Sequence, residues 1–220
     1  MGRPAGVSGA DTMRAIRKAA ISRIYRHGFE AMNLRDLAAD VNLRLGSLYN
    51  HVPQKQEFLA SLLEAIMSEL LADLDSRMAG LHDPLERLLR FVRFHIEWHT
   101  ARKEETFIGN MELRSLTPAQ YESVAEKRKQ YEGHLRAILA DGAKAGLWRL
   151  DDLHVTTLAL LSLLTGISTW YRADGRLSQE RLIRIYRRLT QRLVGLPAPA
   201  RKSATPVARK RSAARKVRAA

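Results

Sequence analysis

Apolar residues recur three and four positions apart along almost the whole chain, and this spacing constrains the fold more than any other feature. It places apolar side chains on one face of a helix, whereas a half-buried strand needs strict alternation of apolar and polar residues. No alternating run bounded by turn residues is long enough to predict a sheet. The sequence therefore predicts an all-helical protein.

Glycine, proline and short polar breaks divide this pattern into separate helices. The predicted helices cover residues 10–27, 34–41, 45–52, 54–79, 84–102, 104–116, 118–144, 151–171 and 178–196. Asn33 and Asp36 resemble a capping box at the start of the second helix. Asn42 suits the left-handed conformation that the following turn requires, and Pro53 ends the third helix.

The charge of the chain is strongly basic and unevenly distributed. Its 37 Lys and Arg residues against 23 Asp and Glu residues give a formal net charge of +14, which attracts polyanions. Eight of these basic residues lie in residues 197–220, which hold no acidic residue, so the rest of the chain has a net charge of +6. This tail has few large apolar residues, and we predict that it is disordered.

The chain has no cysteine, which excludes disulfides and thiolate metal sites. Its first residues have no apolar segment of the kind that a signal peptide needs. The longest apolar run, residues 155–167, is shorter than the roughly 20 residues that span a bilayer. We therefore expect a cytoplasmic protein with no membrane partner.

The predicted helices 34–41 and 45–52, joined by a short turn, form the pattern of a helix-turn-helix, whose second helix enters the major groove of DNA. Arginine and hydroxyl side chains suit phosphate contacts, an asparagine can pair with adenine, and a glycine allows close approach of the backbone. The candidate DNA-binding residues on these helices and the turn are Arg35, Arg44, Leu45, Gly46, Ser47, Tyr49, Asn50 and His51. Leu48 is expected in the core.

The segment NLRDLAADVNLRLGSLYNHVPQKQEFL and the preceding AAISRIYRHGFEAM resemble the N-terminal signature of the tetracycline-repressor (TetR) family. The resemblance covers roughly the first 60 residues. The matching positions are Gly28, Phe29, Leu37, Ala38, Gly46, Ser47, Leu48, Tyr49, His51, Lys55 and Phe58. Two positions depart from the family pattern: Asn42 stands where glycine is usual, and Val52 where an aromatic residue is common.

This resemblance implies a ligand-released repressor that binds a pseudo-palindromic DNA operator as a homodimer. It places Lys55 against the DNA backbone, and it implies that the last two helices of each chain form a four-helix dimer interface. The expected organisation is a flexible N-terminal arm (1–9), a three-helix helix-turn-helix domain (10–53), a C-terminal helical effector-binding and dimerisation domain (54–196) and the basic tail (197–220). Arg3 in the arm either reaches the minor groove or belongs to an untethered terminus.

Polar residues on apolar helix faces indicate where an effector could bind. His95 and His99 extend one apolar stripe, and Arg128 falls on another, so all three should face the second domain's interior or rim. A buried cation needs an acceptor, which a ligand carboxylate or phosphate could supply, although the histidines could be satisfied core residues and Arg128 could reach the surface or pair with a glutamate. Met111 and Trp170 are candidate pocket walls.

The segments FIGNMELRSLTPAQYESVAEKRKQYEGHLRAIL and TWYRADGRLSQERL resemble a subgroup of these regulators that is associated with acyl-CoA thioesters from lipid or sterol breakdown. This resemblance implies that the acyl group enters the helical body. Arg114 and Arg128 would then hold the phosphates of CoA.

Three other hypotheses compete with that of a ligand-released repressor: a metal site, an enzyme and an architectural DNA-binding protein. His95 and His99 lie one helical turn apart and could share a metal, but Ile96 stands where the HExxH zinc motif has glutamate. No Gly-rich phosphate loop or nucleophile elbow is present, so we predict no enzyme activity, no catalytic residue, no resident metal and no cofactor. The last alternative is an architectural protein whose tail binds DNA without sequence preference.

Overall fold

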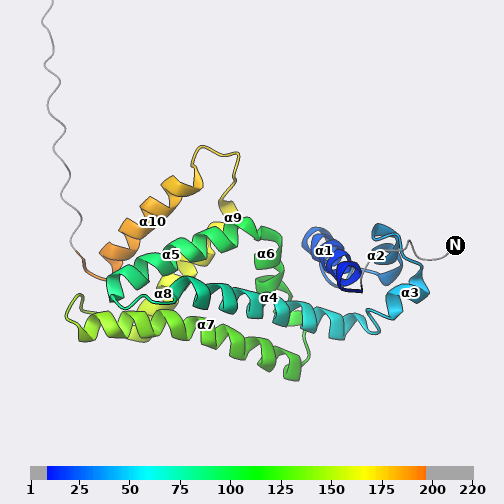
Figure 1. Ribbon diagram of the computed structural model, residues 1–220, viewed down its shortest axis with the longest axis horizontal. Coiled ribbons are helices and arrows are strands. Elements are labelled where there is room, and N and C mark those ends of the chain that lie inside the picture. The colour runs from blue at the N-terminus through cyan, green and yellow to red at the C-terminus, as the bar shows by residue number, and fades with distance from the viewer. Residues whose placement is uncertain (1–8, 197–220) are drawn as a thin grey trace, which may run out of the picture.

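The computed structural model describes residues 9–196 and arranges them as two groups of helices joined by one long helix, α4 (Lys55–Met78) (Figure 1). No strand is present in residues 9–196, and the TetR-like all-helical prediction is confirmed in this respect. Residues 1–8 of the predicted arm and the predicted tail, 197–220, lie outside the described residues.

Three helices form the N-terminal group: α1 (Gly9–His27), α2 (Leu34–Asp40) and α3 (Leu45–Tyr49). Their predicted apolar faces are buried against one another and against the first turns of α4. The fully or almost fully buried side chains of this group are Ile16, Ala20, Ile24, Phe29, Met32, Leu37, Ala38, Leu48 and Val52. The buried position of Leu48 agrees with its predicted place in the core.

The ends of α2 and α3 show which local signals operate. Asn33 Oδ1 accepts the backbone N–H of Asp36 at 2.8 Å, which is the first hydrogen bond of the predicted capping box. In the second, the Asp36 carboxylate accepts from the side-chain amide of Asn33 at 2.7 Å instead of from its backbone N–H. Asn42 has a φ of 54°, as the turn requires. Helix α3 ends at Tyr49 instead of residue 52, because a tight turn, closed by the N–H of Val52 on Leu48 O at 2.8 Å, precedes Pro53.

Helix α4 connects the two groups without a break. Phe58 and Leu62 near its start are buried in the same hydrophobic core as Leu70 and Leu74 near its end. That core therefore runs from α1 into the second group. Because it is closely packed, a displacement of α4 in one group also shifts side chains in the other.

The second group begins with α5 (Pro84–Ala101), α6 (Lys103–Met111) and α7 (Pro118–Lys144). The predicted helix 104–116 is wrong at its end, because a 3-10 turn, η1 (Glu112–Ser115), follows α6. Asp83 and Thr117 cap α5 and α7 at their N-termini, and Thr117 forms a full capping box with Gln120. Helices α4, α5 and α7 pack side by side along the long axis of the molecule (Figure 1).

The last three helices within residues 9–196 are α8 (Leu153–Thr165), α9 (Ile167–Trp170) and α10 (Gln179–Leu193). Gly166 breaks the predicted helix 151–171 in two. By length and composition Leu153–Trp170 passes a test for a membrane-spanning stretch, with a mean hydropathy of 1.4, and 28% of it is buried. The break and the packing of α8 on α5 and α7 identify it as part of the helical body with one apolar face left uncovered.

Candidate DNA-binding surface and effector cavity

The predicted DNA-binding residues lie on and around the short helix α3. Most of them are exposed: Arg35, Arg44, Gly46, Ser47, Tyr49 and Asn50. Leu45, His51 and Lys55 are half-buried. A Cβ atom added at Gly46 would meet nothing within 4 Å, so nothing in residues 9–196 requires a glycine there. This open backbone suits the close approach of an outside molecule.

One groove brings four of these residues together. Arg35 and Leu45 line it with Tyr49 and Lys55, and we call this the α2–α3 groove. Lys55 Nζ is already engaged there, because it donates to Glu30 O at 3.0 Å and lies 4.5 Å from the centre of the Phe29 ring. Its ammonium therefore also fastens α4 to the chain between α1 and α2.

His51 lies apart from the α2–α3 groove. It lines a second groove together with Met13 and Arg17 of α1 and Phe58 of α4. The structure thus separates the imidazole from the side chains of Arg35 and Tyr49, with which the sequence grouped it.

An arginine that the sequence did not single out holds the helix-turn-helix on α1. Arg23 donates through Nη2 to Asp40 Oδ1 at 2.8 Å and through Nη1 to Asp36 Oδ2 at 3.4 Å. The hydrogen bond from Arg23, aided by its charge, lowers the pKa of Asp40. In the sequence, only the alternating charges of α1 and α2 indicate such ion pairs. Which arginine meets which aspartate depends on how the two helices cross.

A cavity of about 660 Å³ opens in the second group of helices. Its walls come from α4, α5, α6, α7 and α8 and from the residues around Gly166. Among the polar residues that line it are His95, His99, Asn110, Arg128, Ser162 and Thr165. Lys129 and Glu132 also line it, and the apolar part includes Met67, Leu70, Leu158 and Leu161, so the cavity offers both apolar surface and polar or charged groups to a ligand.

His95 and His99 are buried and stacked, with ring centres 3.7 Å apart and an angle of 2° between the rings. His95 Nδ1 lies 2.9 Å from the Tyr131 hydroxyl, and its Nε2 lies 3.3 Å from Thr165 Oγ1. Burial, aided by the charge of Arg128, lowers the pKa of His99 to about 4, although the hydrogen bond to His95 O acts in the opposite direction. Burial also lowers the pKa of His95. Both rings are therefore neutral at neutral pH.

The tautomer of His99 follows from its backbone contact. Nδ1 lies 2.9 Å from the carbonyl oxygen of His95, which can only accept, so Nδ1 carries the proton. In a neutral ring Nε2 is then an acceptor. Within residues 9–196 no hydrogen-bond partner of this nitrogen is found, and His99 lines the cavity.

Arg128 lines the same cavity, and its charge meets only neutral oxygen atoms. Nη1 donates to Gly109 O and Nη2 to Asn110 Oδ1, each at 3.1 Å. None of the ion pairs found within residues 9–196 includes Arg128, and burial lowers its pKa. Arg128 is half-buried, and its bond to Asn110 is exposed, so the guanidinium reaches the rim of the cavity without pairing with a glutamate.

Three other predicted ligand residues do not line this cavity. Met111 and Trp170 are exposed, Trp170 to 50%, and Arg114 is exposed on η1. Trp170 is the last residue of α9, which follows the break at Gly166. Met111 ends α6, and Arg114 lies in the following 3-10 turn η1.

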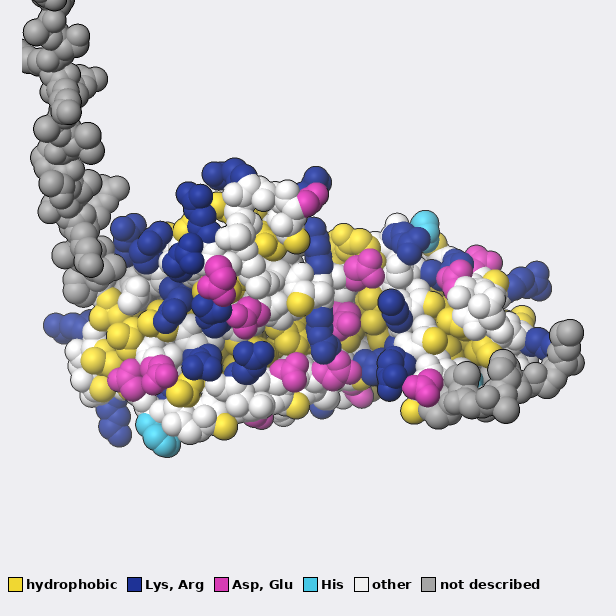
Figure 2. Space-filling view, turned by 45° about the horizontal axis from the view of Figure 1, so that its top comes forward, with side chains coloured by type: hydrophobic (Ala, Val, Ile, Leu, Met, Phe, Trp, Pro, Cys, Tyr) yellow, Lys and Arg dark blue, Asp and Glu magenta, His cyan; other side chains and the backbone are white. Residues whose placement is uncertain are grey.

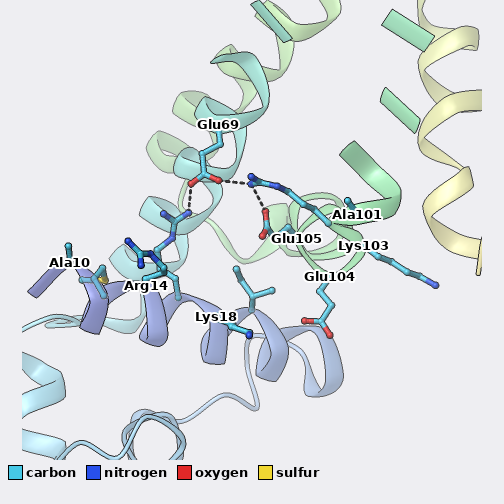
Figure 3. Close-up of a pocket in the computed structure, with 12 residues that line it drawn as sticks. Ala10, Arg14, Lys18, Glu69, Ala101, Lys103, Glu104 and Glu105 are labelled. Carbon is cyan, nitrogen blue, oxygen red and sulfur yellow. Dashed lines mark hydrogen bonds and ion pairs between the residues drawn. The ribbon is translucent and has the colours of Figure 1, made fainter. Parts of the chain in front are cut away.

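An ion-pair network joins the two groups of helices. Glu69 of α4 accepts from Arg17 of α1 at 3.0 Å and from Arg102, which directly precedes α6, at 2.5 Å (Figure 3). Arg102 also donates to Glu105 at 3.2 Å. Burial opposes ionisation of Glu69, but the hydrogen bonds from Arg102 and Arg17 outweigh it and lower the pKa.

Within residues 9–196 no group of three or more metal-ligating side chains comes together, so the hypothesis of a metal at His95 and His99 finds no third His, Asp or Glu ligand.

Comparison with known proteins extends these observations. Residues 81–194 match the family model described as "Tetracyclin repressor-like, C-terminal domain". The HTH-type transcriptional repressor KstR2 of Mycobacterium tuberculosis is 25% identical over 166 residues, which cover 74% of this chain and 82% of the relative.

Two solved structures share the fold at similar identity. A bacterial regulatory protein of the tetR family from Rhodococcus RHA1 superposes with a TM-score of 0.79 and 26% identity, over 87% of this chain and 100% of that one. AibR, solved in complex with isovaleryl coenzyme A and operator DNA, superposes with a TM-score of 0.71 and 26% identity, over 83% of this chain and 98% of that one. The family model alone spans more than half of the sequence, and so the chain belongs to the TetR family of helix-turn-helix transcriptional regulators.

Proposed function

We propose that this protein is a repressor that binds a pseudo-palindromic operator as a homodimer. An amphipathic, anionic metabolite in the cavity of the second group releases the operator, and an acyl-CoA thioester is the first candidate. The observation that carries the proposal is the guanidinium of Arg128, which lines the cavity and donates only to the neutral acceptors Gly109 O and Asn110 Oδ1.

The DNA-binding part of the proposal rests on the exposed side chains around α3. Arg35 and Arg44 supply charge for phosphate contacts, and Asn50 supplies an amide that can pair with adenine. Ser47, Tyr49 and the open backbone at Gly46 add polar contacts beside them. The remaining candidates, Leu45, His51 and Lys55, contact DNA from half-buried positions at the edges of this surface.

The effector part rests on charge and hydrogen-bonding complementarity. Bringing a carboxylate or phosphate to Arg128 replaces two neutral acceptors by a charged one, which gives a stronger hydrogen bond. His99 Nε2 offers an acceptor nearby, which suits a hydroxyl or amide N–H of the ligand. An acyl-CoA thioester supplies anionic phosphates, amide N–H groups and an apolar acyl chain, and the similar protein AibR binds isovaleryl coenzyme A.

The homodimer rests on apolar side chains that one chain leaves uncovered. On α8 Val155 is 62% and Leu158 42% exposed, and on α10 Leu189 and Leu193 are exposed as well. Arginines surround the α10 positions, and Figure 2 shows blue Lys and Arg side chains gathered over this helix. A second copy that covers both helices would remove this apolar surface from water.

A two-state equilibrium connects the two sites. Two recognition helices read a palindrome only when they are about one DNA turn apart, roughly 34 Å. An effector that prefers a dimer with another spacing shifts the population toward that dimer, and the operator dissociates. By linkage, operator DNA weakens effector binding by the same factor.

The experiment that tests this proposal selects bound fragments from genomic DNA and then adds acyl-CoA thioesters of several chain lengths. We expect at least one thioester to release the selected operator at concentrations where free CoA does not. Sedimentation equilibrium should show a dimer, and Leu193→Glu should shift it toward the monomer.

The matched variants are Arg128→Gln and Arg136→Gln, since Arg136 is an exposed arginine on the same helix. Calorimetry should show thioester binding weakened about tenfold or more by the first variant and unchanged by the second. Failure of every thioester to release the operator, or equal binding by both variants, would contradict the effector assignment.

A further inference from the structure

Glu112 is a buried acidic residue that links the cavity-bearing helices to the DNA-binding helices. It lies in η1, is 4% exposed, and belongs to the second group of helices. Its Oε1 nevertheless accepts the backbone N–H of Phe29 at 3.1 Å, and its Oε2 accepts the Ser115 hydroxyl at 2.9 Å. Phe29 follows Gly28 directly, at the point where the chain leaves α1 for α2.

The buried carboxylate of Glu112 depends on the hydrogen bond from the Phe29 N–H. None of the ion pairs found within residues 9–196 includes Glu112, so the Phe29 N–H and the Ser115 hydroxyl are the donors that replace water. A buried acidic group that loses one of its donors is strongly destabilised, and so is a buried N–H that loses its acceptor. The bond therefore holds the exit of α1 in one position relative to η1.

The other end of this segment touches the cavity. Arg128 donates to Gly109 O and Asn110 Oδ1, which belong to the last turn of α6, and Glu112 follows two residues later. Gln56 in the first turn of α4 also donates to Ser115 O. The segment from Gly109 to Ser115 thus has the cavity on one side and the DNA-binding helices on the other.

We propose that Glu112 is the positioning residue through which the state of the cavity reaches the helix-turn-helix. An anion that binds Arg128 withdraws the guanidinium from Gly109 and Asn110, the last turn of α6 loosens, and the bond from Glu112 to Phe29 lengthens or breaks. The identity of the cavity as the effector site rests on the proposed function, whereas the mechanical connection from Arg128 through Glu112 to Phe29 does not.

The test uses the full chain without DNA or effector and measures hydrogen exchange of the Phe29 amide. Glu112→Ala should speed this exchange about tenfold or more relative to amides in the core of α7. Glu112→Gln keeps an amide oxygen that can accept the same bond, so it should restore much of the protection. Arg128→Gln should also speed exchange at Phe29, although the hydrogen bonds of the Arg128 side chain go to Gly109 and Asn110 and not to that residue.

A double variant tests whether the two residues act along one path. If they do, Arg128→Gln added to Glu112→Ala should produce no further acceleration. Glu122→Gln and Arg136→Gln make the same chemical changes at exposed sites of α7 and should leave Phe29 at the wild-type rate. Should Glu112→Ala fail to fold, Glu112→Gln and Arg128→Gln still measure both ends of the path.

Wild-type exchange at Phe29 in Arg128→Gln, or additive effects in the double variant, would overturn the proposal. Failure of acyl-CoA thioesters to release DNA would instead contradict the proposed effector and leave this connection standing. The two failures are therefore distinguishable.

Discussion

His99 makes the stability of the protein depend on pH in a defined window. Its pKa is about 4 in the folded chain, because burial disfavours the charged ring, against a usual value of 6.5. Between these values the unfolded chain binds a proton that the native chain does not, so the free energy of unfolding falls as pH falls from 6.5 toward 4. From pH 7 to pH 5 the decrease due to His99 should be about 2 kcal/mol.

Urea unfolding of the wild type and of His99→Asn at both pH values measures this decrease. The short amide keeps a donor for the His95 carbonyl but does not titrate, so the variant should lose about 2 kcal/mol less than the wild type between pH 7 and pH 5. An identical pH dependence in the two proteins would show that His99 is not buried in its neutral form.

Asn42 carries the turn of the helix-turn-helix at a φ of 54°. Its N–H bonds to Ala39 O at 3.1 Å and that of Leu43 to Ala38 O at 2.9 Å, which closes α2. Alanine is strained in this conformation, so Asn42→Ala should lower the free energy of unfolding by about 1 kcal/mol, whereas Asn42→Gly should be neutral or slightly stabilising. Denaturation midpoints of the two variants give the answer, and equal midpoints would argue against a left-handed residue here.

Conformation at such positions was predictable from residue type, but side-chain partners were not. Asn42 is the kind of residue that adopts positive φ, so the sequence indicated its role. The ammonium of Lys55 lies over Phe29, and His51 lines a groove with Arg17, because of how α1 and α4 cross. No local pattern encodes that crossing, which explains why these two candidates are less free for DNA than expected.

At the scale of helices, Gly142 shows how closely α7 packs on the chain that follows it. A Cβ atom at this position would lie 1.8 Å from Cζ2 of Trp148, whose Nε1 donates to Leu139 O at 2.8 Å. Gly142→Ala must therefore displace the indole and break this hydrogen bond, and it should destabilise the protein by about 3 kcal/mol.

Gly133 provides the control, because it lies in the same helix and an added Cβ would meet nothing within 4 Å. Gly133→Ala should stabilise the protein by about 0.5 kcal/mol through the better helix propensity of alanine. Thermal unfolding followed by tryptophan fluorescence measures both. Equal effects of the two substitutions would mean that Trp148 does not pack on α7.

The helices themselves were largely predictable, and their interruptions were not. The cap at Asn33, which the sequence indicated, marks the start of α2. Neither Gly166, which breaks α8 from α9, nor the change to η1 at Glu112 interrupts the apolar spacing. Trp170, Met111 and Arg114, which lie at or after these two breaks, are outside the cavity, whereas His95, His99 and Arg128 of the uninterrupted helices α5 and α7 line it.

On the scale of the molecule, one core and one long helix make the two groups mechanically dependent. Glu69 adds a second connection, because it binds Arg17 of α1 and Arg102 next to α6 at the same time. These ion pairs are partly exposed and contribute little to stability, about 1 kcal/mol or less each. Their geometry matters more, since through Glu69 they connect α1 to the residue that precedes α6.

The basic tail belongs to this scale too, because its eight Lys and Arg residues supply more than half of the net charge of +14. Charge without acidic neighbours binds DNA through phosphates and carries no sequence preference. Removal of residues 197–220 should therefore weaken binding to random DNA. The dependence of log K on log salt should become shallower by about 0.9 for each phosphate that the tail neutralises in the full-length protein.

Operator preference should survive this truncation, since the candidate base-reading residues lie on α3. Titration of operator and random DNA at several salt concentrations, with the truncated chain and with a full-length variant whose eight tail cations are glutamine, separates charge from chain length. Both variants should raise the ratio of operator to random affinity. If the truncated chain instead loses its preference along with its affinity, recognition resides in the tail, and the protein acts as the architectural DNA-binding protein that its charge alone would predict.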